Sequence, residues 1–184
     1  MSNALSLTAA AIVACLLLYI YPIGKSYETQ DQMSYAIVYK SVSKFADSVR
    51  SKGYITPAMY REFTAELDAT GNMYKIEMQH DEKRYHPVYS DPADETTFLG
   101  DYEVYFEARY TPHIMEVLFP EQGSAVPEQE RKYLLKQYDY FTVRVSNTNT
   151  TKATLVRNFL NMGSSGNVVR IHIPYGGMVL NEDY

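Results

Sequence analysis

The first 24 residues of this 184-residue chain lack any charged side chain, and residues 5–23 are nearly all apolar. At about 1.5 Å per residue, a helix over this run is about 28 Å long, close to the hydrocarbon thickness of a bilayer. The remaining 160 residues or so are polar and long enough for one domain with its own core. The absence of charge from one stretch therefore predicts a single hydrophobic helix followed by a water-soluble head.

The chain also has only one cysteine and no tryptophan. Because Cys15 lies inside the hydrophobic run, no disulfide can form within the chain. We interpret this cysteine as a small apolar membrane residue, with acylation as the alternative. The 18 tyrosines fit either exposed sheets with subunit contacts or a tyrosine-rich core, since tyrosine buries a large area and keeps a polar tip.

No excess of positive charge is present: the net charge is -5 and the pI is about 5.4. Such a balance gives no indication of nucleic-acid binding or of attraction to an anionic lipid surface.

The hydrophobic run has three interpretations. A cleavable signal peptide is disfavoured because no Lys or Arg precedes the run and no small-residue cleavage site follows it. A membrane anchor fits, with Tyr19 and Tyr21 at the interface and Lys25 just outside, although the acids that follow Lys25 leave the orientation undetermined. The third interpretation is a filament-forming helix that resides first in a membrane and later in a protein core.

The segment that follows favours the third interpretation. Apolar residues spaced 3, 4, 3 and 4 apart predict an amphipathic helix that ends near residues 52–53, and they are Tyr35, Val38, Val42, Phe45 and Val49. Only Pro22 and Gly24 interrupt the path from the apolar run, and proline can kink a helix without ending it. We expect one helix over residues 4–52, with two helices and a polar hinge at 25–32 as the alternative.

Residues 53–184 are predicted to form an α+β head with an antiparallel sheet. Thr56 and Pro57 mark a helix start, and Gly71 its end. Alternating segments predict strands at 73–80, 102–110, 140–146 and 168–173, with a last strand or turn at 176–180. Further expectations are a helix or strand at 111–119, a helical turn in 128–137, a helix at 154–162, loops at 81–100 and 120–127, and a turn at 163–167.

No catalytic, cofactor or metal constellation emerges from the sequence, so we expect a protein that is not an enzyme. His80 and His86 flank two acids in the predicted loop, but their spacing matches no tight metal pattern. Signatures for phosphate loops, dinucleotide binding, zinc proteases and serine hydrolases are lacking. Asn149 begins a glycosylation tripeptide, and an ordinary turn explains the same residues.

The layout resembles type IV pilin-like proteins: a nearly uncharged N-terminal helix, a proline some twenty residues in, an amphipathic continuation and a β-rich head. The local strings are similar to those of small membrane-anchored proteins of Firmicute tight-adherence (Tad/Flp-like) pilus loci, namely GYITPAMYREFTAELDATGNMYKIEMQH, YFTVRVSNTNTTKATLVRNFL and GGMV. The resemblance implies a pilin, minor pilin or pseudopilin, assembled by an ATPase-driven machine in the membrane.

Two features depart from that family. No basic leader precedes the helix, which leaves Ala4 and Leu5 as the plausible cleavage site. Ala9 occupies the place of the usual glutamate, which in pilins pairs with a neighbouring N-terminus. The register of the helix in a filament would then be set by shape alone.

We therefore expect three segments: a membrane or filament-core helix at 1–24, its amphipathic continuation at 25–52 and the head at 53–184. The function expected is that of a structural subunit of an extracellular pilus-like filament, found in the cell membrane or envelope of a prokaryote. Its partners would be its own copies, the membrane and the assembly machinery. The alternative is a monomeric membrane protein with a partner-binding head. The residues expected in the core helix are Leu5, Leu7, Ala10, Ile12, Val13, Leu16, Leu17, Leu18, Ile20 and Pro22.

Overall fold

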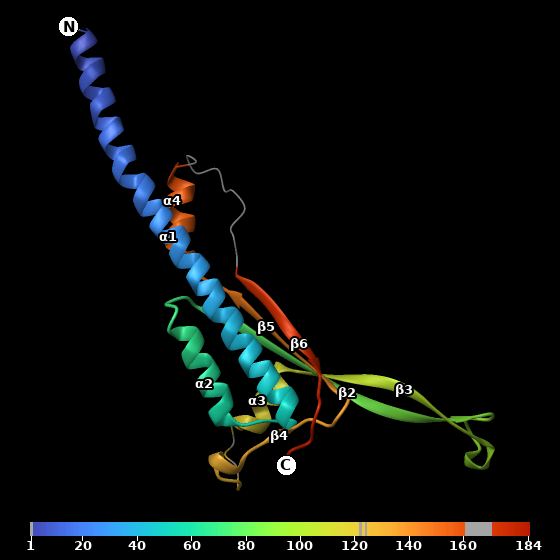
Figure 1. Ribbon diagram of the computed structural model, residues 1–184. Helices are drawn as coiled ribbons and strands as arrows, with labels where there is room; N and C mark the ends of the chain where they lie inside the picture. Colours follow the sequence, from blue (N-terminus) through green and yellow to red (C-terminus); the bar gives the residue numbers. More distant parts are fainter. Residues whose placement is uncertain (1, 122, 124, 161–170) are drawn as a thin grey trace.

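The computed structural model describes residues 2–121, 123, 125–160 and 171–184, and it has an α+β fold (Figure 1). One long helix, α1 (Ser2–Lys52), runs out of the head and carries the N-terminus far from it. The helix passes through Pro22 without interruption, so one continuous helix is observed and the alternative with two helices is wrong. Pro22 is exposed, where the ring costs a backbone hydrogen bond but meets no neighbouring element.

The head begins with a short strand and a capped helix, as the turn chemistry predicts. β1 (Tyr54–Ile55) leads into α2 (Pro57–Asp68), and the hydroxyl of Thr56 accepts a 3.2 Å hydrogen bond from the backbone N–H of Met59. Gly71 follows α2 with a φ of 75°, a conformation that glycine adopts without a steric cost. The cap and the stop residues therefore fix both ends of α2.

A four-stranded antiparallel sheet forms the body of the head. Its strands are β2 (Tyr74–Tyr89), β3 (Phe98–Tyr110), β5 (Tyr140–Asn147) and β6 (His172–Met178), in the order β3-β2-β5-β6. A smaller sheet pairs β1 with β4 (Tyr133–Leu134). The remaining helices are α3 (Thr111–Leu118), α4 (Lys152–Leu160) and the single turns η1 (Glu95–Thr97) and η2 (Glu128–Glu130).

The expectation of a loop at 81–100 is wrong, because strands occupy most of it. β2 and β3 pair from Gln79↔Tyr110 out to Tyr89↔Phe98, whereas β2 pairs with β5 only as far as Asp81↔Tyr140. Beyond that point the two strands continue alone as an arm, defined here as residues 85–105, that projects from the head (Figure 1). Pro87 suggested a loop, but it lies where the register shifts, a position that tolerates proline in a strand pair.

The core lies between one face of the sheet and helices α1 and α2. Alternation along β5 buries Phe141, Val143 and Val145, as its sequence pattern indicates. Of the predicted strand at 168–173, only residues from 171 on are described; β6 includes residues 172–173 and continues to Met178, into the segment predicted as a last strand or turn. The predicted turn at 163–167 lies outside the described residues. The helix expected at 154–162 is observed as α4, and within 128–137 the only helical turn described is η2.

Candidate functional site

The N-terminal half of α1 exposes a continuous apolar surface. Among the predicted core-helix residues, Leu5 is 76% exposed and Leu18 is 74% exposed, and only Ile20 is half-buried. This helix is long and apolar enough to cross a membrane, and none of its most apolar window is buried against the head. An exposed apolar surface of this length is not compatible with water alone, so it needs lipid or protein around it.

The C-terminal half of α1 forms part of the head core. Val38, Val42, Phe45 and Val49 are buried, and the ring of Phe45 stacks on that of Phe63 at a centroid distance of 4.5 Å. The same helix is therefore exposed on all sides over residues 5–19, within its bare half (residues 5–24), and has one face packed into the head over residues 34–52, its packed half.

Tyr35 differs from the expected stripe. It is 49% exposed, and the buried position at this level of the helix is Ser34. Residues 34, 38, 42, 45 and 49 follow the 3.6-residue period, whereas residue 35 lies about 100° further round the helix. Tyr35 fits the apolar spacing, but the prediction that it lies on the buried face is wrong, because the head packs against Ser34 instead.

A polar collar at 25–32 separates the bare half from the packed half. Lys25 pairs with Glu28 at 3.3 Å, and Glu28 also receives Arg157 from α4 at 3.5 Å. The hydroxyl of Thr151 donates to Asp31 at 2.7 Å. The hydrogen bond from Lys25, with a smaller contribution from Arg157, lowers the pKa of Glu28. Nothing in the sequence pattern indicates that α4 would lie here.

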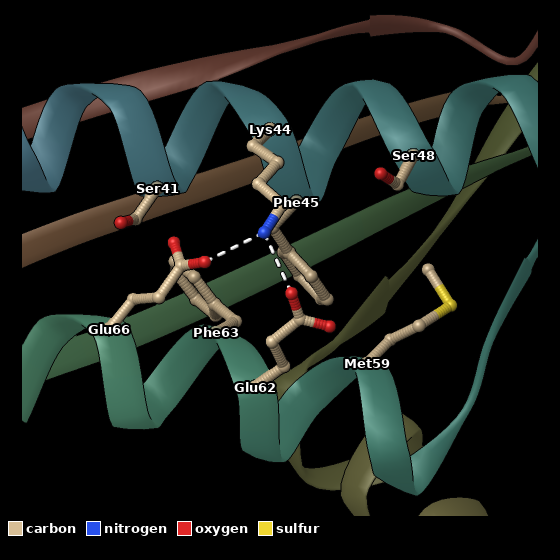
Figure 2. A pocket seen from close by; sticks show the side chains of 8 residues that line it. All are labelled: Ser41, Lys44, Phe45, Ser48, Met59, Glu62, Phe63 and Glu66. Atoms are coloured by element: carbon tan, nitrogen blue, oxygen red, sulfur yellow. Dashed lines mark hydrogen bonds and ion pairs between the residues drawn. The ribbon is translucent and has the colours of Figure 1, made fainter.

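Charged side chains also fasten α1 to α2. Figure 2 shows the ammonium group of Lys44 on α1 between two carboxylates of α2, with Nζ 2.7 Å from Glu62 and 2.7 Å from Glu66. These hydrogen bonds raise the pKa of Lys44 and lower that of Glu66. The cavity beside them measures only about 40 Å³, far below the several hundred Å³ of a ligand pocket. We therefore interpret these ion pairs as a structural contact between α1 and α2 and not as a ligand site.

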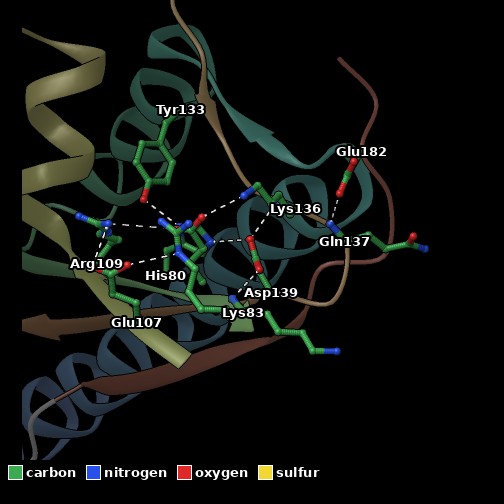
Figure 3. A network of polar contacts seen from close by, with 11 residues as sticks. His80, Lys83, Glu107, Arg109, Tyr133, Lys136, Gln137, Asp139 and Glu182 are labelled. Carbon is green, nitrogen blue, oxygen red and sulfur yellow. Dashed lines mark hydrogen bonds and ion pairs between the residues drawn. The ribbon is translucent and has the colours of Figure 1, made fainter. Parts of the chain in front are cut away.

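A second polar network surrounds His80 of β2 and connects this strand with Tyr133 and Asp139 (Figure 3). His80 is 3% exposed; its Nε2 lies 2.9 Å from Asp139 Oδ2 and its Nδ1 lies 2.8 Å from the Tyr133 hydroxyl. Asp139 also accepts the backbone N–H groups of Lys83 and Lys136, at 2.8 and 2.7 Å. Because an ionised carboxylate only accepts hydrogen bonds, Nε2 is the donor to Asp139.

The polar atoms of His80 form hydrogen bonds within the protein and are not directed towards a ligand. Both ring nitrogens of His80 have partners within the protein, and burial raises the pKa of Tyr133 to about 12. A neighbouring pocket of about 440 Å³ is lined by charged residues including Glu82, Arg109 and Lys136. Of these, Lys136 and Arg109 already pair with Glu82, at 3.1 and 3.9 Å. These contacts therefore have a structural role: they hold β2 against the loop before β5.

The two histidines considered as metal ligands are not brought together. His80 is buried in the sheet and His86 is exposed on the arm, six residues further along one strand, which corresponds to about 20 Å. Both lie on β2, His80 within the predicted strand 73–80 and His86 in the segment expected to be a loop. Within the part of the chain that the structure describes, no three His, Cys, Asp or Glu side chains are grouped so that they could hold a metal ion.

The arm is another exposed region with apolar side chains. β3 is one of the two edge strands of the sheet, and nearly all of its side chains are exposed. The large apolar side chains exposed on the arm are Tyr85, Phe98, Leu99, Tyr102, Val104 and Tyr105. Exposed edge strands of this kind are sites where other chains can pair.

Comparison with known proteins identifies no related protein. No protein-family model matches the chain, and no curated protein or solved structure matches it. The function is therefore inferred from the residues and geometry described above.

Proposed function

We propose that this protein is a structural subunit of an extracellular pilus-like filament. The observation that carries the proposal is the division of α1 into two halves. One half is charge-free, apolar and bare, and the other forms part of the head core. A rigid connection of this kind lets the position of the bare half determine the position of the head.

The bare half would occupy two environments in turn. As a membrane helix it meets lipid, and in the filament it packs against the same half of other copies. Burial of a side chain as large as leucine contributes about 1.5–3 kcal/mol relative to water, so a bundle of such helices is a stable filament core. Ala9, Ala10, Ala11 and Ala14 would permit close approach of neighbouring helices.

The resemblance to type IV pilin-like and Tad-locus proteins supports the same proposal. It suggests copies of this chain, the cell membrane and a membrane-bound assembly machine as partners, in a prokaryotic cell envelope. The proposal assigns the head a packing role and no catalysis. In line with that role, the buried network around His80 has its ring nitrogens paired within the protein.

Ala10→Asp tests the proposal directly. A carboxylate at this position would have to be buried without a partner in the helix bundle, so we expect the variant to form no filaments while its head stays folded. Electron microscopy of material sheared from cells would detect the filaments, and circular dichroism of the purified chain would detect the fold. Its abundance in the membrane fraction must be measured too, because a charge in a membrane helix costs about 2.5–3.5 kcal/mol on insertion.

Ala58→Asp is the matched control. Ala58 is exposed in the first turn of α2, where an acidic side chain is favourable, so this variant should assemble like the original chain. If Ala10→Asp also forms filaments of normal appearance, the helix-bundle core is wrong.

The arm favours a second candidate function, a single-pass membrane protein whose head binds a partner. Its exposed edge strand and apolar side chains provide a surface that a partner could cover. Recovery of the chain only from detergent-solubilised membrane, and never from sheared filaments, would favour this candidate.

A further inference from the structure

The position of α4 against α1 can be read from two contacts. Thr151, just before α4, bonds to Asp31, and Val156 lies so close to Gly24 that a Cβ there would meet its Cγ1 at 3.3 Å. Five residues further along α4, the contact has moved seven residues towards the N-terminus of α1. The two helices therefore run antiparallel, and the C-terminal end of α4 points along the bare half of α1 (Figure 1).

The end of α4 reaches the level of the apolar run. From Val156 to Leu160 an α-helix rises about 6 Å, which corresponds to about four residues on the antiparallel α1. Phe159 and Leu160 therefore lie near the level of residues 20–21, inside the charge-free segment. The half-burial of Ile20, next to fully exposed neighbours, agrees with this placement.

The apolar side chains at this end of α4 are not packed into the head. Phe159 is 71% exposed, Leu155 is 58% exposed and Leu160 is 48% exposed. The side of α4 that faces α1 and the head carries the buried Ala153 and Thr154 instead. A nine-residue helix thus presents its largest apolar side chains away from the core, at the level where α1 becomes apolar.

Charged groups occupy the opposite, head-side end of this contact. The charged ends of Lys25, Lys152 and Arg157 lie at the collar with Glu28 and Asp31, so cations exceed anions by one. Arg157 itself follows Val156 on α4, and its guanidinium reaches back to Glu28. Lys152 is exposed, with its ammonium group 5.8 Å from the ring of Tyr27. Cations at this level match the phosphate groups of lipid headgroups, and tyrosines such as Tyr19 and Tyr21 are typical of the boundary just inside them.

We propose that α4 is a second membrane contact: its C-terminal end, with Leu155, Phe159 and Leu160, inserts into the lipid–water interface beside α1. The surface is continuous with the apolar run, and its cations lie on the side where headgroups would lie. On α4 the separation runs along the axis, since Lys152 begins the helix at the headgroup side and the exposed Phe159 and Leu160 end it at the apolar side. The contact would hold the head at a fixed tilt on the bilayer. The inference rests on the membrane stage of the proposed function and not on filament assembly.

A single introduced tryptophan tests this inference, because the chain has none of its own. The full-length Phe159→Trp variant would be reconstituted in phosphatidylcholine vesicles that contain lipids with quenchers both near the headgroup and along the acyl chain. We expect a blue-shifted emission, strong quenching by these lipids and protection from aqueous iodide. Phe159 is exposed, so the substitution leaves the head core intact.

Two matched variants provide the reference signals for a tryptophan in water and a tryptophan in lipid. Tyr85→Trp, on the exposed arm, should be quenched by iodide and not by lipid, and Leu16→Trp, in the apolar run, should be quenched by lipid only. If Phe159→Trp behaves like Tyr85→Trp while Leu16→Trp contacts lipid, the inference is overturned and the proposed function is untouched. If Leu16→Trp does not contact lipid, the membrane stage fails and the inference fails with it.

A second copy of the chain is the other possible occupant of this surface. In that case the blue shift and the protection of Phe159→Trp would disappear when the protein is diluted into excess lipid, which would overturn the lipid contact. Protection that is independent of the protein-to-lipid ratio supports it.

Discussion

Asp139 is a buried residue on which several polar contacts converge. It is 1% exposed, accepts the side chain of His80 and accepts the backbone N–H groups of Lys83 and Lys136. These groups come from β2 and from the loop before β5, so one carboxylate fixes the point where the arm leaves the sheet. Its partners are 59 and 56 residues away on the β2 side, and no local pattern in the sequence links them.

Asp139→Asn should destabilise the protein by about 3 kcal/mol, because the amide nitrogen cannot accept and a buried donor loses its partner. Denaturant unfolding of the full chain in detergent, followed by circular dichroism, measures the free energy of unfolding. Asp68→Asn is the control; Asp68 is exposed on α2 and should change stability by less than about 0.5 kcal/mol. Equal stabilities for the two variants would mean that the network does not support the fold.

Residue-level signals in the sequence were reliable where the interaction is local. The Thr56 cap involves residues three apart, and the observed bond to Met59 agrees with it. His80 was expected at the end of the half-exposed strand 73–80, beside two acids and a predicted loop, and its burial was not expected. The structure places it in a strand and buries it, since the partner that makes burial possible lies on a distant segment.

At the scale of elements, α1 is the feature that organises the molecule. Its packed half lies against α2 and the sheet, and Phe45 is at the centre of this contact, with its ring 4.5 Å from Phe63 and 6.2 Å from Phe141. The docking of α1 therefore determines the direction in which the bare half leaves the head.

Phe45→Ala should lower the free energy of unfolding by about 3–5 kcal/mol, the usual cost of removing a large buried aromatic side chain. Tyr35→Ala, on the same helix but at a position that is 49% exposed, should cost only about 0.5 kcal/mol. Thermal and denaturant unfolding of both full-length variants would compare them. A cost at Tyr35 as large as that at Phe45 would contradict the placement of the buried face.

The arm shows why element boundaries in the head were only partly predictable. Prolines and acids in 81–100 are typical of loops, yet a strand pair persists there because each strand satisfies the other's backbone groups. The unpaired outer edge of β3 and the exposure of its side chains have no counterpart in the local sequence pattern.

At the scale of the whole molecule, charge and stability are unevenly distributed. The arm contains five acidic residues and no Lys or Arg, so it alone accounts for a charge of -5, the same as the net charge of the chain. Acidic side chains on an exposed edge disfavour uncontrolled pairing with other strands. The acids are Asp91, Asp94, Glu95, Asp101 and Glu103.

Hydrogen exchange should reveal the same division. Amides of the arm lie in a ribbon of only two strands. Those of residues 74–81 lie within the four-stranded sheet, where β2 pairs with β5 and, at residues 79–81, also with β3. Isolated two-stranded ribbons are marginally stable, so we expect exchange in the arm to be much faster than in β5 and the start of β2. Mass spectrometry of the full chain in detergent would measure it. Equal protection would indicate that another chain covers the arm.

The sequence by itself determined the features that depend on neighbours along the chain. The charge-free run, the cap of α2 and the alternation of β5 all follow from composition, periodicity and local hydrogen bonding. Only the tertiary structure decided that α1 is one helix and not two, that Ser34 and not Tyr35 is buried, where α4 lies and which residues surround His80. Those outcomes depend on contacts between segments far apart in the chain, where burial of one surface competes with burial of another and leaves no local signature.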